Sequence, residues 1–353
     1  MKLIRASIYS QNQRFVNGPY RCRNQSEAGF DATLIKLETD QGVTGWGEMA
    51  PLGAFYSAAF AEGARAGLSV LLPGLIGLDP TQIALINRHM DQLLNGHPYV
   101  KTPIDMACWD LLGKQSGLSI AELLGGRFTE STRLYRSISQ ASPESMAQQA
   151  VQYQSEGYQH LQVKVGDDPL LDAERLRVIR NNCDPDTLLL ADANGAWHTG
   201  NALRFVKATQ GIEYFLEQPC MTMKECEAIR KQCRQPMILD ESIETLSDLE
   251  QAIKMGISGV TIKLSRVGGI ERARQIRDLA IASRLKICIE DTGGSNIDSA
   301  ATTHMMISIP EEFQMHSVDF MNWVKEQNAT GMPPVSLGKI HAPRAPGLGL
   351  EVL

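Results

Sequence analysis

Three acidic residues in the second half of the chain each follow an apolar run, at intervals of about 25 residues. They are Asp192 in LLLADAN, Glu217 in EYFLEQP and Asp240 in MILDES. This interval is the length of one strand–loop–helix–loop unit of a (β/α)₈ barrel, in which roughly 250 residues form eight units. Carboxylates at the C-terminal ends of consecutive parallel strands would converge on one face. They would repel one another unless a hard cation lay between them, and an all-oxygen ligand set suits Mg²⁺ or Mn²⁺.

The sequence around these acids alternates between short apolar runs and amphipathic helical segments, which predicts βαβ units and a parallel sheet. Eight runs read as strands: TRLYRSIS, HLQVKV, TLLLAD, EYFLE, PMILD, GVTIKL, KICIE and FQMHSV. The predicted fold class is therefore α/β, with a (β/α)₇β barrel like the TIM barrel and an N-terminal α+β capping domain.

The first part of the chain does not show this regular alternation of strands and helices. Residues 31–48 alternate around a polar Asp-Gln-Gly turn and predict a β-hairpin. Helical patterns follow near 58–72, 80–94 and 101–117, with Pro80 and Pro103 suited to first-turn positions. The domains that we expect are a capping domain over 1–125, the barrel over 126–332, and a Pro- and Gly-rich segment over 333–353 that returns to the capping domain.

Composition narrows the class of protein further. The net charge is −6 with acidic and basic residues interspersed, so we expect no nucleic-acid partner. No run of 18 apolar residues and no signal-like start are present, so we expect no membrane span. The seven cysteines are odd in number and form no CxxC pair, which favours reduced thiols in the cytoplasm.

Two lysines bracket the three acids. Lys164 ends the second predicted strand, in LQVKVG, and Lys263 ends the sixth, in GVTIKLSRVGG. Strands 2 and 6 of an eight-stranded barrel are roughly opposite, so the two amines would face each other across the metal site. A lysine beside a cation and a second lysine can have its pKa lowered toward neutrality, which makes it a usable base. Removal of the α-proton from a carboxylate substrate would then give an enediolate that the metal stabilises.

Each of these residues also has a structural interpretation. A single acid after a strand is more often a helix N-cap or a solvated side chain, and three in succession are what favour a metal site. A lysine at a buried strand end could be the ion-pair partner of one of the acids, because lysine is rarely buried unpaired. Asn194, in ADANGAW, fits a strand-end turn equally well.

Six motifs, in the order LQVKVG, ADANGAW, FLEQPC, LDES, IKLSRVGG and IEDTGG, resemble those of the enolase superfamily. The resemblance is to its muconate-lactonizing-enzyme subgroup, within the mandelate racemase/muconate lactonizing enzyme family. Members of the superfamily use a Lys or His base together with Mg²⁺. TDQGVTGWGE and KTPIDMACWDLLGK resemble the capping domain of the family, so the resemblance covers nearly the whole chain.

The resemblance implies a role for each matched position. The metal ligands would be Asp192, Glu217 and Asp240, the acid/base pair would be Lys164 and Lys263, and Asn194 and Gln162 would support them. Asp291, at the end of the seventh strand, would orient a neighbour, for example by hydrogen bonding to Lys263, although it could equally cap the helix after GGSN. The resemblance also implies a Mg²⁺ cofactor, with Mn²⁺ as an alternative, and a homo-oligomer.

Two positions depart from the pattern of the subgroup. The second strand commonly carries Lys-x-Lys, whereas Gln162 stands at the first of these positions here. Glutamine at this position resembles the branch that acts on proline derivatives, the cis-3-hydroxy-L-proline dehydratases and the proline or hydroxyproline betaine epimerases. Gly293 stands where relatives in this branch often carry Trp, so the pocket wall should differ there.

Specificity should come from residues around the capping-domain loops at 17–21 and 51–56. Tyr56 and Trp323 could line the substrate pocket and face a cationic amine through cation–π contact, or could simply pack. Asp319, just after the eighth strand, could pair with a substrate ammonium or be exposed.

The function that these observations predict is abstraction of the α-proton of a small carboxylate substrate with Mg²⁺, followed by dehydration of cis-3-hydroxy-L-proline or a similar cyclic imino acid. The alternative is a racemase or 2-epimerase of proline betaine or hydroxyproline betaine, and a further one is a dipeptide epimerase or cycloisomerase. A zinc metallohydrolase would call for His-rich ligation, and no predicted strand end carries an HxH pair. A non-enzymatic binding protein would need neither the acids nor the lysines.

Overall fold

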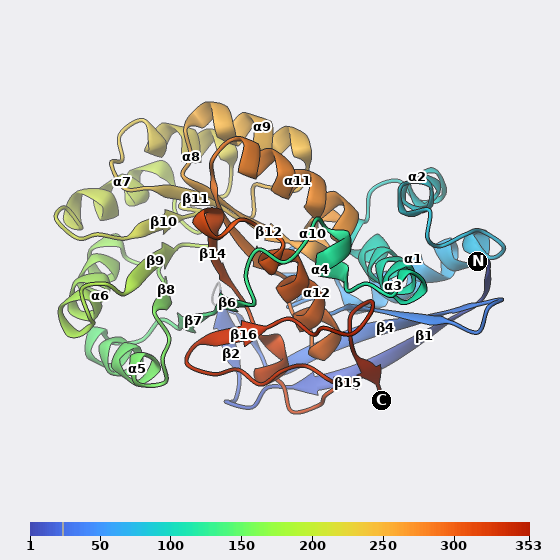
Figure 1. Ribbon diagram of the computed structural model, residues 1–353. Helices are drawn as coiled ribbons and strands as arrows, with labels where there is room; N and C mark the ends of the chain where they lie inside the picture. Colours follow the sequence, from blue (N-terminus) through green and yellow to red (C-terminus); the bar gives the residue numbers. More distant parts are fainter. Residues whose placement is uncertain (23–24) are drawn as a thin grey trace.

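The first part of the chain forms a three-stranded antiparallel sheet in the order β1–β4–β5 (Figure 1). The computed structural model describes residues 1–22 and 25–353. The strands of the sheet are β1 (Leu3–Arg14), β4 (Gly29–Thr39) and β5 (Thr44–Met49), and the short strands β2 (Tyr20–Cys22) and β3 (Gln25–Glu27) pair with each other. Strands β4 and β5 pair directly on either side of the Asp-Gln-Gly turn, which confirms the predicted hairpin.

Helices follow this sheet, as the sequence predicts. They are α1 (Ala61–Leu75), α2 (Ile83–Leu93), α3 (Pro98–Ser116) and the short α4 (Ile120–Leu123). The first-turn positions predicted for two prolines are wrong, because Pro80 precedes α2 and Pro103 lies inside α3, which starts at Pro98. A Cβ atom on Gly47 of β5 would lie 1.9 Å from the carbonyl oxygen of Pro103. Only glycine therefore permits this close approach of β5 to α3.

The second part of the chain contains eight parallel strands that are neighbours in sequence order. They are β7 (Tyr135–Ile138), β8 (His160–Lys164), β9 (Leu188–Asp192), β10 (Phe215–Glu217), β11 (Met237–Leu239), β12 (Gly259–Lys263), β13 (Lys286–Glu290) and β14 (Gln314–Ser317). A parallel bridge between Leu134 and Ser317 connects the two ends of this sheet and nearly closes the barrel. The predicted eight-stranded barrel is confirmed.

Each connection between consecutive strands carries a helix on the outside of the barrel (Figure 1). These helices are α5 (Pro143–Ser155), α6 (Pro169–Asn182), α7 (Thr199–Ala208), α8 (Met223–Arg230), α9 (Leu246–Met255), α11 (Ile270–Ala282) and α12 (Asn296–Ile307). A short helix, α10 (Leu264–Val267), follows β12 directly, and the short 3₁₀ helices η1 (Glu311–Phe313) and η2 (Phe320–Asn322) flank β14. Seven β/α units and a last strand give the predicted (β/α)₇β architecture.

Local sequence explains where several of the outer helices begin. The side chain of Asp168 accepts hydrogen bonds from the backbone N–H groups of Leu170 and Leu171, and Pro169 occupies the first position of α6. Thr245 and Asp248 form a reciprocal capping box at the start of α9. These side chains satisfy N–H groups that have no partner within the helix, so they fix the start of the helix at the end of the loop.

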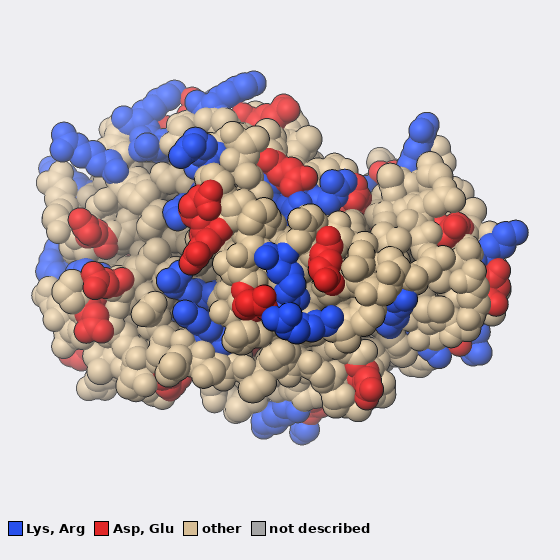
Figure 2. All heavy atoms as spheres, in the orientation of Figure 1, with Lys and Arg blue, Asp and Glu red and all other residues tan. Residues whose placement is uncertain are grey.

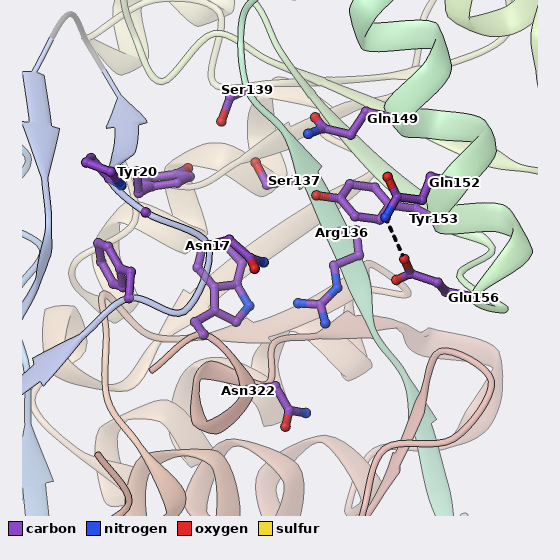
Figure 3. A pocket seen from close by; sticks show the side chains of 14 residues that line it. Asn17, Tyr20, Arg136, Ser137, Ser139, Gln149, Gln152, Tyr153, Glu156 and Asn322 are labelled. Atoms are coloured by element: carbon purple, nitrogen blue, oxygen red, sulfur yellow. Dashed lines mark hydrogen bonds between the residues drawn. The ribbon is translucent and has the colours of Figure 1, made fainter. Parts of the chain in front are cut away.

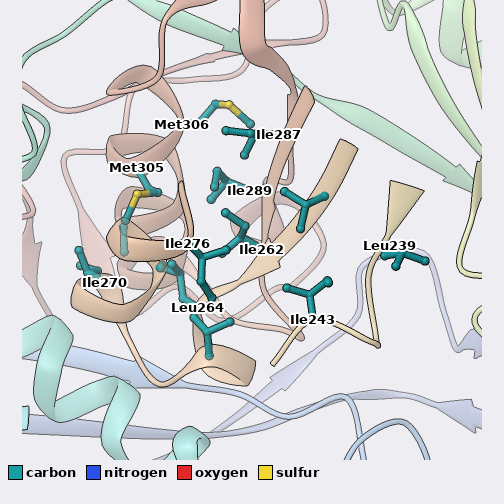
Figure 4. Packing of buried hydrophobic residues seen from close by; sticks show 14 of the residues in the cluster. Leu239, Ile243, Ile262, Leu264, Ile270, Ile276, Ile287, Ile289, Met305 and Met306 are labelled. Atoms are coloured by element: carbon teal, nitrogen blue, oxygen red, sulfur yellow. The ribbon is translucent and has the colours of Figure 1, made fainter. Parts of the chain in front are cut away.

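The hydrophobic core lies between the barrel strands and the surrounding helices. Figure 4 shows Ile262 of β12 and Ile287 and Ile289 of β13 packed toward Met305 and Met306 of α12. All five side chains are completely buried. Burial of one such side chain contributes about 1.5–3 kcal/mol to stability. This packing holds the strand ends, and the polar side chains that follow them, in fixed positions.

The C-terminal segment contacts both parts of the protein. Its strand β16 (Lys339–His341) pairs with β6 (Ser131–Arg133) just before the barrel, and β17 (Glu351–Val352) pairs with β15 (Ala329–Thr330). The backbone N–H of Leu348 donates to Asp110 Oδ1 of α3 at 2.9 Å. The exact limits of the three predicted domains stay a prediction.

The outer surface carries charges of both signs. Figure 2 shows basic and acidic side chains interspersed over one face of the molecule, as the sequence pattern indicates. Among the described residues, no helix has the length and apolar character needed to cross a membrane.

Candidate active site

The three predicted metal ligands lie at the C-terminal ends of adjacent strands. Asp192 ends β9, Glu217 ends β10, and Asp240 follows β11. Asp192 and Glu217 are direct neighbours in the sheet register. All three residues are at most 1% exposed. The spacing of the acids in the sequence therefore reflects consecutive strands of one parallel sheet.

Two of the acids are paired with basic side chains. Lys164 Nζ donates to Asp192 Oδ2 at 2.6 Å, and Lys263 Nζ lies 3.0 Å from Asp240 Oδ2. Arg266 Nη1 donates to Asp240 Oδ1 at 2.5 Å. Burial opposes ionisation of Asp240, but the charges of Arg266 and Lys263 outweigh it and hold the pKa of Asp240 below its usual range. Both lysines are therefore ion-pair partners of the acids in this structure, which is the structural role that the sequence analysis considered for them.

Glu217 lies between these two pairs and meets polar groups. It accepts hydrogen bonds from Gln162 Nε2 at 3.0 Å and from Thr261 Oγ1 at 2.8 Å. Burial raises its pKa well above the usual value, and the charges of Asp192 and Asp240 raise it further. A carboxylate in this position is destabilised unless a cation is added to the group of acids.

The donor set fits a hard divalent cation by its chemistry. It consists of oxygen ligands only, the carboxylates are buried, and their mutual repulsion would be relieved by a bound ion. In the part of the chain that the structure describes, however, no group of three or more His, Cys, Asp or Glu side chains surrounds one metal-sized point. Asp192 and Asp240 are paired instead with Lys164, Lys263 and Arg266.

The surroundings of Lys263 favour its charged form. Its Nζ atom donates to the Tyr56 hydroxyl at 2.6 Å and lies 3.5 Å from Glu290 Oε2, in addition to Asp240. Burial lowers the pKa of Lys263, but Asp240, Tyr56 and Glu290 together raise it well above its ordinary value. The protein groups alone therefore shift this pKa in the direction opposite to the predicted one. A lowered value would require a cation that competes for Asp240.

Asn194 connects Lys164 to the acids. Its side-chain oxygen accepts from Lys164 Nζ at 3.1 Å, and its backbone N–H donates to Asp192 Oδ1 at 2.8 Å. Its amide Nδ2 donates to Glu241 Oε1 at 3.1 Å. The residue has a positive φ of 46°, which Asn adopts more easily than most residues. The strand-end turn considered for Asn194 is therefore observed, and its supporting role in the site stays a prediction.

The predicted hydrogen bond between Asp291 and Lys263 is not found among the described residues. Asp291 accepts instead from the backbone N–H of Ser265 at 3.0 Å and from that of Thr292 at 2.7 Å. The reason is the alternation of side chains along β13. Glu290, the last residue of the strand, points into the barrel toward Lys263, and Asp291 turns to the start of α10.

Both lysines line one cavity of about 40 Å³ between the barrel and the capping domain. Gln162, Glu290 and Asp291 contribute to its polar end. Most of the remaining lining is aromatic and includes Phe15, Tyr20, Tyr56, Phe320 and Trp323. The two amines therefore face the same small space, as their positions on strands 2 and 6 predict.

The structure assigns different contacts to the three predicted pocket residues. The Tyr56 ring lies 5.0 Å from Lys263 Nζ, so its cation–π contact is with the protein's own lysine. Trp323 lines the cavity and meets the Tyr20 ring edge-on. Asp319 is completely buried and lies 3.4 Å from Arg136 Nη1. The exposed position considered for Asp319 is wrong, because Arg136 of β7 covers it.

Gly293 has no room for a larger side chain. A Cβ atom there would lie 2.6 Å from the ring of Phe30 and 2.7 Å from the carbonyl oxygen of Ala50. Phe30 belongs to strand β4 of the capping domain and lines the same cavity. Phe30 therefore fills the space beside Gly293 from the other part of the protein.

Three polar residues near the lysines were missed by the sequence analysis. Glu290 could have been recognised from the alternation of KICIE, which places it inside the barrel. Arg266 lies within IKLSRVGG and Glu241 within LDES, so both belong to motifs that were singled out for other residues. Burial raises the pKa of Glu241 to about 7, with the charges of Asp240 and Asp192 adding to the effect.

This fold agrees with comparisons to known proteins. Residues 6–125 match the mandelate racemase/muconate lactonizing enzyme N-terminal domain, and residues 145–353 match the enolase C-terminal domain-like family. The chain belongs to the mandelate racemase/muconate lactonizing enzyme family of the enolase superfamily, and it is an enzyme of that superfamily.

Individual relatives perform several reactions. The chain is 40% identical to a cis-3-hydroxy-L-proline dehydratase of Roseibium aggregatum, over 99% of this chain and 96% of that protein. It is 27% identical to an N-succinyl-L-Arg/Lys racemase of Bacillus cereus, over 100% and 96%. A solved structure of an enolase superfamily member from Roseovarius nubinhibens, complexed with magnesium, has a TM-score of 0.94 and 35% identity, over 99% and 96% of the two chains.

Proposed function

We propose that the protein is a metal-dependent dehydratase of cis-3-hydroxy-L-proline or a similar cyclic imino acid. The observation that carries the proposal is the pair of Lys164 and Lys263, which face one small cavity beside three buried carboxylates. The similarity over nearly the whole chain to a dehydratase of this substrate supports it. Gln162, which lines the cavity next to Lys164, supports the same branch of the family.

The size and lining of the cavity favour a compact substrate. The cavity is small, about 40 Å³, so a compact ring requires less rearrangement of its lining than a dipeptide or an N-succinylated amino acid. The rings of Phe15, Tyr20 and Trp323 at one end would contact the apolar CH₂ groups of a pyrrolidine. The carboxylate of the substrate would lie at the polar end, near the acids and lysines.

The metal is part of the proposal. Asp192, Glu217 and Asp240 would hold it, and when bound it would supply the positive charge that makes the α-proton of the substrate more acidic. Its binding would also draw Asp240 away from Lys263 and Asp192 away from Lys164. Each lysine would then lose its nearest negative partner, which lowers its pKa and favours the neutral amine that can accept a proton.

The stereochemistry of the substrate explains why two lysines are needed. In cis-3-hydroxy-L-proline the carboxylate and the hydroxyl group lie on one face of the ring, so the α-hydrogen lies on the other. One lysine would accept the α-proton on one face, and the second would protonate the leaving hydroxyl group on the opposite face. The C–H and C–O bonds break, water leaves, and the enamine product tautomerises to a pyrroline carboxylate.

The same arrangement of lysines also favours an alternative, the 2-epimerisation of proline betaine or hydroxyproline betaine. In that reaction one lysine removes the α-proton and the other returns a proton to the opposite face. The two proposals share their first step and differ in what happens to the deprotonated substrate. The substrate that is turned over therefore distinguishes them.

Incubation with Mg²⁺ and each candidate substrate, followed by NMR and a pyrroline assay, tests the proposal. We expect pyrroline carboxylate from cis-3-hydroxy-L-proline and much slower elimination from the trans isomer, in which the α-hydrogen and the hydroxyl group share one face. A deuterated epimer of a betaine in D₂O without any elimination would support the alternative. Equal elimination from the cis and trans isomers would contradict the roles proposed for two opposed lysines.

A further inference from the structure

Gln218 connects the segments that follow the three strands with the predicted metal ligands. It comes directly after Glu217, the last residue of β10, in the motif FLEQPC. Its side-chain oxygen accepts from the backbone N–H of Asp240, after β11, at 3.0 Å, and from that of Ser242 at 3.2 Å. Its backbone oxygen accepts from the N–H of Gly195, in the loop after β9, at 2.8 Å. One residue therefore contacts all three segments.

The side-chain amide of Gln218 is fully used. Its Nε2 atom donates to the carbonyl oxygen of Cys220 at 2.9 Å and to Ser242 Oγ at 2.5 Å, so both N–H groups and both acceptor positions of the oxygen have partners. The residue is completely buried. Its φ of 32° costs free energy for a residue other than glycine, and such a conformation persists only where the surrounding contacts hold it. The contacts of the amide therefore fix this part of the chain.

The carboxylates on these segments repel one another. The charges of Asp192 and Asp240 raise the pKa of Glu217, in addition to the effect of burial. This repulsion would decrease if the segment with Asp240 moved away from the end of β10. The hydrogen bond to Gln218 opposes such a movement, because breaking it would leave the N–H of the buried Asp240 without a partner.

We propose that Gln218 is a positioning residue for the divalent cation, because it holds the backbone of Asp240 close to Glu217 before the cation binds. Both oxygens of the Asp240 side chain contact Lys263 or Arg266, so binding of a cation would require this side chain to reorient. A fixed backbone restricts the change to the side chain, which lowers the free-energy cost of binding. The inference rests on the metal dependence in the proposed function.

The cavities at the mouth of the barrel do not involve Gln218. A larger cavity of about 570 Å³ lies next to the one between the lysines and is bounded by residues 15–20, the end of β7, α5 and η2 (Figure 3). Gln218 is not among the described residues that line either cavity. A substitution of Gln218 therefore leaves the side chains of both linings in place, and its effect should be on metal affinity.

Titration calorimetry with Mg²⁺ and the apo protein tests the positioning role. Gln218→Met keeps the length of the side chain but removes its donors and acceptor. We expect the Kd for Mg²⁺ to rise by about tenfold or more, as is typical when a group that orients a metal ligand is removed. Gln218→Asn keeps a polar amide and tolerates the positive φ, but it is one CH₂ group too short to reach Asp240, so its Kd should rise as well.

Gln235→Met is the matched control. Gln235 precedes β11 at the opposite end of the barrel, where its Nε2 atom donates to the carbonyl oxygen of Ile212 at 2.8 Å. This variant loses a side-chain hydrogen bond beside the same strand, but none at the acids, so its Kd for Mg²⁺ should equal that of the wild type. Thermal denaturation in EDTA shows whether each variant is folded and measures its stability without the cation.

A wild-type Kd for Mg²⁺ in the folded Gln218 variants would overturn the inference, as would an equal rise in Gln235→Met. Turnover of cis-3-hydroxy-L-proline by the wild type is measured separately. Turnover together with unchanged Kd values leaves the proposed function standing and the role of Gln218 wrong. Weaker Mg²⁺ binding in the Gln218 variants without turnover by the wild type means the reverse, and no Mg²⁺ binding by the wild type would contradict both.

Discussion

A hydroxyl group from the capping domain is the closest hydrogen-bond partner of Lys263. Tyr56 accepts from Lys263 Nζ at 2.6 Å and lies 3.3 Å from Asp240 Oδ2. The sequence analysis placed Tyr56 near the pocket, with its ring either facing a cationic amine of the substrate or simply packing. The structure indicates that Tyr56 positions the lysine, and a contact between two parts of the chain 207 residues apart has no signal in local sequence.

Replacement of Tyr56 by Phe should therefore reduce turnover more than stability. The variant keeps the ring that packs beside Lys263 and removes only the hydroxyl group, so we expect kcat to fall by about tenfold, the effect of one hydrogen bond to a charged group. Steady-state kinetics together with urea denaturation checks this. Tyr9→Phe, at a tyrosine that is 47% exposed on β1, is the control. A Tyr56→Phe enzyme with wild-type kcat would exclude the positioning role.

At the scale of elements, helix α3 links the capping domain to the barrel through a buried acid. Asp105 accepts from Asn87 Nδ2 of α2 at 2.6 Å and from the backbone N–H of Glu271, in the first turn of α11, at 3.1 Å. The sequence predicted helix α3 from its pattern of apolar residues. It did not predict this contact. An Asp within a helix is usually exposed, and the sequence alone does not show that the start of α11 lies against Asp105.

The pH dependence of stability should report on this link. Burial raises the pKa of Asp105 to about 7, while the unfolded chain releases the same proton near 3.8. The folded state thus binds more protons between these values, so stability falls as the pH rises from about 4 to 7, by a few kcal/mol. Urea denaturation at several pH values should show a smaller decline for Asp105→Asn. Asp186→Asn, at an exposed position, should keep the wild-type decline; the same decline in Asp105→Asn would contradict the assignment.

At the scale of the whole molecule, the barrel was predictable and the site at its mouth only in part. Regular alternation of strands and helices fixes the order of the strands, and so places Asp192, Glu217, Asp240 and both lysines at one end. The contacts that the capping domain makes there were not predictable. Phe30 fills the space beside Gly293 and thereby shapes the cavity from a different sheet. Assembly into a homo-oligomer stays a prediction.

Metal binding should stabilise the whole protein. Relief of the repulsion among the three buried acids occurs only in the folded state, so a bound ion shifts the equilibrium away from the unfolded chain. At a Mg²⁺ concentration 100 times Kd the free energy of unfolding should rise by about 2.7 kcal/mol. Thermal denaturation with Mg²⁺ and with EDTA measures this, and Glu217→Gln should reduce the difference. Equal Tm values for the wild type in both conditions would argue against a metal site at these acids.

The central claim is that two opposed lysines act on opposite faces of a small carboxylate substrate, and that one of them accepts the α-proton. The most direct measurement is the rate at which the α-proton signal of cis-3-hydroxy-L-proline disappears from the NMR spectrum in D₂O with Mg²⁺, because it detects the first step whether elimination or epimerisation follows. We predict a measurable rate for the wild type and a fall of about a thousandfold or more in whichever of Lys164→Ala and Lys263→Ala lacks the proton acceptor, as expected when a general base is removed. Loss of the α-proton at the wild-type rate in both variants would contradict the claim.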